Sequence, residues 1–491
     1  MLVVGAGLSG INAGYRLQTE LPHKRYVILE ARESIGGTWD LFRYPGIRSD
    51  SDMYTLGYPF RPWDSDRTIA DGGSILEYVR STAQRYGIDR QIRFRHRVTR
   101  AEWSTEHGCW RVEAELPEGE TAHFTCRFLF MCTGYYRYDQ GYLPPLPNLD
   151  RFAGEVVHPQ FWPDHLDYRD KRVVVIGSGA TAVTLVPALA EQAANVTMLQ
   201  RSPSYVVSLP RHDSLARLAR RLLPLRQAYR LVRWKNTLLM VLSFQLSRRR
   251  PELMKRLIRR GVERALPEDC DIDRHFTPRY NPWEQRLCLV PDRDLFDAIA
   301  SRRASVVTDQ IATFTERGIR LASGAELEAD VVVTATGLNL QLFGGAEILI
   351  DGRPVDAAET LVYRGCMLSG VPNFAFVFGY TNASWTLRSD LTCRFVVRLL
   401  RHMEECGHSS AVPRARDGAM PTLPFVDFSS GYILRSLSRL PRQGTRPPWR
   451  LRQNYLLDLA EFRLRPVHEP DLEFSGDGAL AAAPAVAVPA S

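Results

Sequence analysis

Short apolar runs that end in glycine-rich turns recur along this chain. Residues 2–4 are apolar and lead into Gly5-x-Gly7-x-x-Gly10, and a helical pattern and a second apolar run follow, ending at Glu30. A strand, a Gly-x-Gly-x-x-Gly turn, a helix and a second strand make up the βαβ unit that binds dinucleotides. The first thirty residues therefore predict one such unit.

The same pattern returns in residues 172–201. Residues 172–176, apolar after Arg172, lead into Gly177-Ser-Gly179, and a helical pattern and another apolar run follow, ending just before Arg201. One glycine-rich motif is weak evidence, but two in the same strand–turn–helix setting support each other. We therefore predict a second βαβ unit here.

The residues at the ends of the second strands of the two units differ in charge. Glu30 can accept hydrogen bonds from ribose hydroxyls and would repel a 2′-phosphate, whereas Arg201 can pair with one. The first unit thus favours FAD or NAD, and the second favours NADPH. A flavin and its reductant in one chain would form a redox unit. The alternative is that the second glycine motif is only a tight turn.

Other segments complete the predicted fold. Alternating residues at 110–116 and 122–131 predict a hairpin, residues 329–334 predict a buried strand, and residues 211–265 predict helices, one of them beginning at Pro251. The fold class is α/β, with two Rossmann-like dinucleotide-binding domains, for FAD and NADPH, and a helical insertion. The expected parts are residues 1–140 and 330–474 for FAD, 150–208 and 285–329 for NADPH, 209–284 for the insertion, and a disordered Ala/Pro-rich tail at 475–491.

The net charge of +8 is concentrated in one block. Residues 211–260 contain 15 basic and two acidic side chains, a net of +13, so the rest of the chain is slightly acidic. One interpretation is a lid over a substrate cavity with a solvated arginine face. Another is attachment to an anionic membrane surface, with Trp234 and Phe244 as apolar anchors. Nucleic acid is disfavoured, because no recognition motif accompanies the charge.

The eight cysteines indicate no disulfide framework. None forms a Cys-x-x-Cys pair, and we expect no histidine at zinc-ligand spacing and hence no metal. Without a redox-active pair a flavin disulfide reductase is excluded, and O2 is the remaining common electron acceptor. No secretory signal or apolar run of about 20 residues occurs. We expect a cytoplasmic protein, or one peripheral to the inner face of the cell membrane.

A family resemblance rests on further motifs. Residues 152–163 read Phe-x-Gly-x-x-x-His-x-x-x-Trp-Pro, which resembles the signature of Baeyer–Villiger monooxygenases, and residues 36–50 resemble that family's second motif. The chain is most similar to the ethionamide-activating monooxygenases of mycobacteria, from Leu2 to about residue 470. This similarity is carried by residues 36–58, 158–163, 174–190, 196–203, 279–291, 334–345 and 380–391.

The resemblance implies roles for individual residues. The FAD set is Gly5, Gly7, Gly10 and Glu30, with Trp39 and loop 43–50 against the flavin; the NADPH set is Gly177, Gly179, Arg201 and Ser202. Arg286 would be the catalytic arginine and Asp50 its partner, although Asp50 as a loop cap stays open. Gln285 replaces a lysine of some members. The fingerprint residues Phe152, Gly154, His158 and Trp162 would act on conformation, His158 as an interdomain tie rather than a general base.

The resemblance also implies a reaction. The substrates would be O2 and a small lipophilic ketone or thioether, and the ketone would yield an ester or lactone, with sulfoxidation as a side activity. One alternative is a flavin monooxygenase acting mainly on sulfur or nitrogen. Another is a membrane-surface flavoprotein with only idle NADPH oxidase activity.

Overall fold

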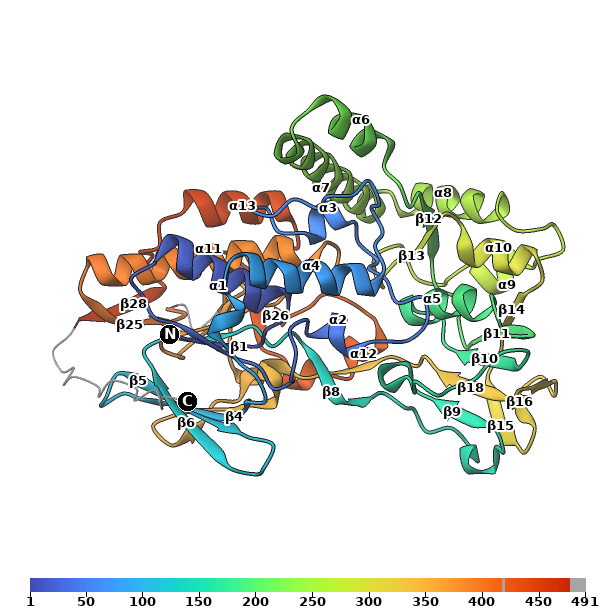
Figure 1. Ribbon diagram of the computed structural model, residues 1–491, viewed down its shortest axis with the longest axis horizontal. Helices are drawn as coiled ribbons and strands as arrows, with labels where there is room; N and C mark the ends of the chain where they lie inside the picture. The colour runs from blue at the N-terminus through green and yellow to red at the C-terminus, as the bar shows by residue number, and fades with distance from the viewer. Residues whose placement is uncertain (417–419, 477–491) are drawn as a thin grey trace.

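A five-stranded parallel sheet forms the centre of the N-terminal unit in this computed structural model, which describes residues 1–416 and 420–476 (Figure 1). Its order is β24-β7-β1-β2-β3, formed by Phe374–Phe376, Leu129–Met131, Leu2–Val4, Val27–Leu29 and Ile92–Arg93. Both faces of the sheet are buried, so its strands are continuous apolar runs instead of alternating ones. Val3 packs under the helices on one face, while Leu2 and Val4 pack on the other.

Three helices cover the first face of this sheet. They are α1 (Leu8–Glu20), α4 (Gly72–Arg85) and α11 (Trp385–Glu405). The other face packs on a largely antiparallel sheet of order β21-β20-β4-β5-β6, formed by Arg353–Pro354, Glu347–Ile350, Arg97–Ser104, Cys109–Glu115 and Thr121–Cys126. The α/β class predicted from the sequence is confirmed.

The predicted hairpin is confirmed, because β5 pairs with β6 in antiparallel register, but its second arm is shorter than expected. Residues 122–131 do not form one strand, because β6 ends at Cys126 and β7 begins at Leu129 in the other sheet. At the crossing, the amide Nδ2 of Asn373 donates to the Arg127 carbonyl at 2.8 Å. The pattern of residues 122–131 has no turn signal between the two strands, so it conceals this change of sheet.

A second five-stranded parallel sheet has the order β14-β11-β10-β18-β9. Its strands are Ala304–Thr308, Asn195–Gln200, Arg172–Ile176, Val331–Thr334 and Glu155–Val157, and α5 (Ala180–Leu189) and α10 (Asp294–Ala300) pack beside it. The boundary expected at residue 330 is therefore displaced. Val332 pairs with Val174 and Val333 with Val157, so β18 belongs to this second sheet.

The basic block forms helices, as predicted, that project from one side of the molecule (Figure 1). They are α6 (Ser214–Leu222), α7 (Leu225–Arg249), α8 (Pro251–Glu263) and α9 (Ile272–Phe276), framed by the paired strands β12 (Val206–Leu209) and β13 (Cys288–Pro291). Within residues 1–416 and 420–476, no helix is both long and apolar enough to span a bilayer.

The buried Arg233 anchors α7 to the first unit. Its Nη1 donates to the carbonyls of Tyr54, Thr55 and Gly57 at 2.6, 3.1 and 2.7 Å. Two of these residues lie in α3 (Met53–Leu56), and the third follows it directly. The insertion is therefore held through backbone carbonyls of the first unit.

Smaller elements complete the chain. They are α2 (Thr38–Leu41), α12 (Gly431–Leu434), α13 (Tyr455–Leu464), β8 (Tyr136–Gly141), β15 (Ile311–Thr315), β16 (Gly318–Leu321), β17 (Glu326–Glu328), β19 (Leu338–Leu340), β22 (Val362–Tyr363), β23 (Met367–Leu368), β25 (His408–Pro413), β26 (Thr422–Pro424), β27 (Arg442–Gly444) and β28 (Leu472–Gly476). Because β28 pairs with β25, Ser475 and Gly476 are ordered strand residues and not part of a tail; residues 477–491 of the predicted tail lie outside the described residues.

Candidate active site

A cavity of about 1110 Å³ lies where the carboxyl ends of the two parallel sheets face each other. Ligands of open parallel sheets bind at such strand ends. Of the residues predicted from sequence, those that line it are Gly5, Gly7, Glu30, Trp39, Asp50, His158, Gly177, Gly179, Arg201, Ser202 and Arg286. Those that do not are Gly10, Phe152, Gly154 and Trp162.

The first glycine turn is sterically obligatory. Gly5 has a φ of +102°, and a Cβ there would lie 2.7 Å from the Cys132 carbonyl oxygen. A Cβ on Gly10 would lie 1.8 Å from the Gly5 carbonyl oxygen, so Gly10 serves the packing of helix on strand although it does not line the cavity. At Gly7, the N-cap of α1, no side chain caps the helix. Its first N–H groups are therefore open to an anion.

Glu30 is held rigidly at the end of β2. Its Oε2 accepts from the Ala6 N–H at 2.6 Å and its Oε1 from the Arg32 N–H at 2.9 Å. Burial raises the pKa of Glu30, opposed by these two backbone hydrogen bonds. Each oxygen retains a second lone pair, so the carboxylate can also accept from a ligand hydroxyl.

The second glycine turn is closed at Gly177 and open at Gly179. Gly177 has a φ of +143°, and a Cβ there would lie 2.4 Å from the Ala335 carbonyl oxygen. A Cβ on Gly179 would meet nothing within 4 Å, and no side chain caps α5, which begins just after it. Arg201 is exposed at the cavity rim and forms no ion pair or hydrogen bond through its side chain with any described residue. Open space, free N–H groups and a free guanidinium suit a phosphorylated ligand.

Asp50 and Arg286 form a two-point ion pair in the cavity. Arg286 Nε lies 2.6 Å from Asp50 Oδ2, and its Nη2 donates to Oδ1 at 2.8 Å. Burial alone would lower the pKa of Arg286, but the charge of Asp50 and the nearby phenols outweigh it and raise that pKa. The guanidinium is therefore a permanent, oriented positive charge.

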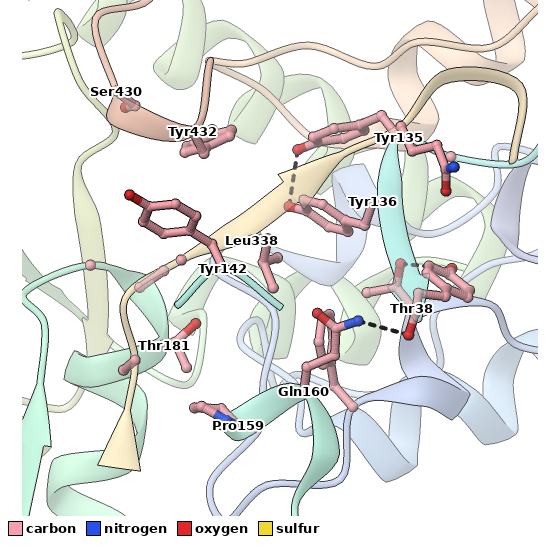
Figure 2. A pocket seen from close by; sticks show the side chains of 18 of the residues that line it. Thr38, Tyr135, Tyr136, Tyr142, Pro159, Gln160, Thr181, Leu338, Ser430 and Tyr432 are labelled. Carbon is pink, nitrogen blue, oxygen red and sulfur yellow. Dashed lines mark hydrogen bonds between the residues drawn. The ribbon is translucent and has the colours of Figure 1, made fainter. Parts of the chain in front are cut away.

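Tyrosines surround this pair, and no sequence motif indicated them. Figure 2 shows Tyr135, Tyr136 and Tyr432 around the cavity, with the hydroxyls of Tyr135 and Tyr136 joined by a 3.0 Å hydrogen bond. Burial raises the pKa of all three, so they remain neutral phenols. Tyr135 and Tyr136 directly follow β7 and its turn, and their place after a parallel strand was the available signal.

A second ion pair ties the same loop to the second unit. Arg48 Nη1 lies 2.5 Å from Asp294 Oδ2, at the start of α10. Both side chains are largely buried. Arg48 and Asp50 therefore connect loop 43–50 to two separate elements of the second unit. No motif predicted Asp294 as their counterpart.

The histidine of the fingerprint occupies a linking position. His158 Nδ1 accepts from the Gln160 N–H at 3.2 Å, and Nε2 faces the Gly337 carbonyl at 3.3 Å. These partners fit a neutral ring protonated on Nε2, and burial lowers the pKa of His158. Gln160 in turn donates through Nε2 to the carbonyls of Arg137 and Tyr138 at 2.9 and 2.8 Å. The tie predicted for His158 thus has explicit backbone partners.

The other fingerprint residues serve packing. Phe152 packs edge-on against Phe314 with ring centres 6.2 Å apart, and Trp162 packs in the same way on Tyr168 at 6.2 Å. A Cβ on Gly154 would lie 2.4 Å from the Asp330 carbonyl oxygen. These side chains hold the linker between the sheets in place.

Comparison with known proteins supports this description. A model of flavin-binding monooxygenase-like proteins matches residues 56–217, and one of NAD(P)-binding Rossmann-like domains matches residues 3–63. The chain is 54% identical to the FAD-containing monooxygenase EthA of Mycobacterium tuberculosis over 97% of each chain.

Two solved structures show the same fold. A cyclohexanone monooxygenase bound to ε-caprolactone has a TM-score of 0.75 at 21% identity, covering 96% of this chain and 99% of that one. An oxidized steroid monooxygenase bound to NADP has a TM-score of 0.69 at 24% identity, covering 84% and 87%. The predicted resemblance is confirmed, and this chain belongs to the family of FAD-containing monooxygenases that includes EthA.

Proposed function

We propose that the protein is an FAD- and NADPH-dependent Baeyer–Villiger monooxygenase. It would insert one atom of O2 between the carbonyl carbon of a ketone and its neighbour, giving an ester or lactone, while the other atom leaves as water. The observation that carries the proposal is the Asp50–Arg286 pair in a cavity lined by both glycine turns. The named relative is FAD-containing, and one structural neighbour was solved with NADP.

The residues present fit both cofactors. The pyrophosphate of FAD would meet the uncapped N-terminus of α1 at Gly7, and its ribose would meet the Glu30 carboxylate. NADPH would lie along the open backbone at Gly179, with its 2′-phosphate on the unpaired Arg201. When bound, FAD reduced by NADPH supplies the electrons that activate O2.

The chain itself supplies fixed charge. Negative charge develops on oxygen as a ketone is oxidised, and Arg286 meets it with a guanidinium that Asp50 already holds at two points. Because the group is oriented before the reaction, little reorganisation is needed. Tyr135 and Tyr432 stay protonated and line the same cavity, so their hydroxyls can donate to a substrate oxygen.

Product analysis tests the proposal. The purified protein, with FAD and NADPH, is incubated with matched ketones and thioethers, and products are identified by mass spectrometry. We expect ester or lactone one oxygen heavier than the ketone, with R286A forming far less. Sulfoxide without any ester would instead assign a heteroatom monooxygenase. Consumption of NADPH and O2 with peroxide as the only product would assign idle oxidase activity.

The insertion favours a second role, binding to an anionic membrane surface. Its helices expose large apolar side chains at helical spacing, which on α7 form the stripe Leu231, Trp234, Leu238, Leu242 and Leu246. On α6 the equivalent residues are Leu215, Leu218 and Leu222, and on α8 they are Leu253 and Leu257. None of residues 211–260 lines the cavity, so the alternative of a cavity lid does not describe this structure. Phe244 packs on Trp283 instead of serving as an anchor.

Free positive charge accompanies this apolar surface. Arg221, Arg226, Arg230 and Arg249 form no side-chain ion pair or hydrogen bond with any residue in the described ranges. Leucines that enter the lipid headgroup region together with arginines that meet anionic lipids are typical of helices lying in a membrane surface. Charge complementarity therefore favours an anionic bilayer as the occupant.

Vesicle sedimentation tests this role. We expect binding to phosphatidylglycerol vesicles that declines with salt, and little binding to phosphatidylcholine vesicles. L222S/L242S should weaken binding, because these side chains are 72% and 63% exposed, whereas L464S, 82% exposed on α13, should not. Equal binding by all three proteins would refute the proposal. Self-association that only L222S/L242S abolishes would assign the face to a second copy.

A further inference from the structure

Three metal-ligating side chains converge at the C-terminal end of α11. His402 and Cys406 lie one helical turn apart, and His408 begins β25. One ligand atom from each lies within 4.8 Å of the other two, and Cys406 Sγ is 3.7 Å from His402 Nδ1. The expectation of no histidine at zinc-ligand spacing is thus wrong. Gly407, with a φ of +67°, turns the chain so that His408 returns toward the helix.

Two nitrogens of the cluster lack partners. His402 Nε2 and His408 Nδ1 are buried and accept or donate no hydrogen bond among the described residues. The ring of Phe474 on β28 packs against both histidines, with ring centres 5.1 and 4.9 Å away. Buried nitrogens are rarely left unpaired unless a water or an ion completes them. The orphaned Nδ1 of His408 is therefore an observation independent of the ligand spacing, whereas His402 would reach an ion through Nδ1, the nitrogen beside Cys406 Sγ, and not through its orphaned Nε2.

We propose that His402, Cys406 and His408 bind one zinc ion, with a water or the exposed His468 in the fourth position. Two imidazoles and a thiolate are typical zinc ligands. Bond lengths of roughly 2.0 and 2.3 Å in a tetrahedron place nitrogen and sulfur about 3.6 Å apart, close to the observed 3.7 Å. On binding, the Cys406 thiol releases its proton to solvent and no electron is transferred.

The surroundings favour a cation at this point. The C-terminal end of a helix carries partial negative charge, and Cys406 is the C-cap of the 21-residue α11. The ring of His468 lies 6.1 Å from that of His402 and stacks on Phe474 at 5.9 Å. A small rotation would therefore bring His468 to the ion.

The position indicates a structural ion and not a catalytic one. None of the three ligands lines the cavity. Trp385, at the opposite end of α11, does line it and stacks on Tyr135 at 5.2 Å. A helix of 21 residues is roughly 30 Å long. The ion would join the end of α11 to β25 and, through strand pairing, to β28.

Metal content and stability test the proposal on the FAD-loaded protein. We expect one zinc per chain after dialysis, a higher unfolding temperature with zinc than with chelator, and unchanged turnover. Cobalt(II) should give a thiolate charge-transfer band in the difference spectrum. In C406S the band should vanish and zinc affinity should fall by at least about tenfold. Loss of a residue that only hydrogen-bonds to a metal ligand already lowers metal affinity by about 10–100-fold.

Two further variants keep the test decisive. C270S changes the other partly exposed thiol and should bind zinc normally. H408N removes a ligand on a different element and should lose zinc as C406S does. Wild-type protein that binds well under one zinc per chain, or C406S that binds zinc as tightly as wild type, would overturn the assignment.

Discussion

Replacing Arg286 with alanine removes the fixed positive charge and leaves Asp50 without its partner. The lost contacts are those of 2.6 and 2.8 Å between the guanidinium and the carboxylate. Loss of one preorganised donor at a developing oxyanion costs about 10²–10³ in rate, or about 3–4 kcal/mol. We expect ester formation by R286A to fall by this factor.

Two companion variants separate charge from orientation. R286K keeps a positive charge but cannot form the two-point contact. Since a hydrogen bond to a charged group is worth about 1.5–3 kcal/mol, at least a tenfold loss is expected. In R286A/D50N the stranded carboxylate is also removed, and because both residues act as one unit, the double variant should be no slower than R286A.

The assay follows NADPH oxidation, oxygen uptake, peroxide and ester in the same reaction. With intact FAD binding, R286A should consume NADPH but release peroxide in place of ester. Folding should be little affected, because the side chains of Arg286 and Asp50 are 31% and 27% exposed to the cavity. Ester formation by R286A above about one tenth of the wild-type rate would refute the role given to Arg286.

Four other substitutions have distinct outcomes. In steady-state kinetics, R201A should raise KM for NADPH about 10–100-fold and leave kcat and the KM for NADH little changed. An equal rise in the KM for NADH would contradict the 2′-phosphate role of Arg201. The Cβ of G10A would lie 1.8 Å from the Gly5 oxygen, so this variant should have a lower unfolding temperature in calorimetry and a lower FAD content. The Cβ of G179A would meet nothing within 4 Å, so this variant should fold normally and show only weaker NADPH binding in titration. Burial lowers the pKa of His158, so the contribution of His158 to stability is present above about pH 6.5 and is lost as pH falls through the lowered pKa. The unfolding temperature of H158Q should therefore depend less on pH below about 6.5 than that of the wild type. An identical pH profile for the two proteins would count against this role.

The sequence predicted the elements whose pattern is local. Val3 and its neighbours, the glycine turn after them and Glu30 all fall within thirty residues, and the structure shows the strand, helix and strand expected there. The placement of Asp50 beside Arg286 was available only through family resemblance. Nothing in local pattern joins residues 236 positions apart.

Where prediction failed, the cause was pairing at a distance. β6 and β7 were expected as one strand but belong to different sheets, since β7 pairs with β1 and β24. The expectation of no histidine at zinc-ligand spacing missed His402, one helical turn before Cys406, and His408, which returns toward the helix after the turn at Gly407. Both errors concern points where the chain changes direction, which depends on tertiary contacts more than on residue type.

Loop 43–50 has a consequence for the timing of turnover. It lies in the chain between β2 and β3 of the first sheet. Arg48 and Asp50 nevertheless pair with Asp294 and Arg286, whose neighbours pack in the core of the second sheet. Any rotation of one sheet relative to the other must break both ion pairs or carry the loop along. Salt weakens the partly exposed Asp50–Arg286 pair more than the largely buried Arg48–Asp294 pair, so we expect release of oxidised NADP to accelerate with ionic strength through the first of these pairs. This eight-residue loop would then set the kinetic barrier between one catalytic cycle and the next.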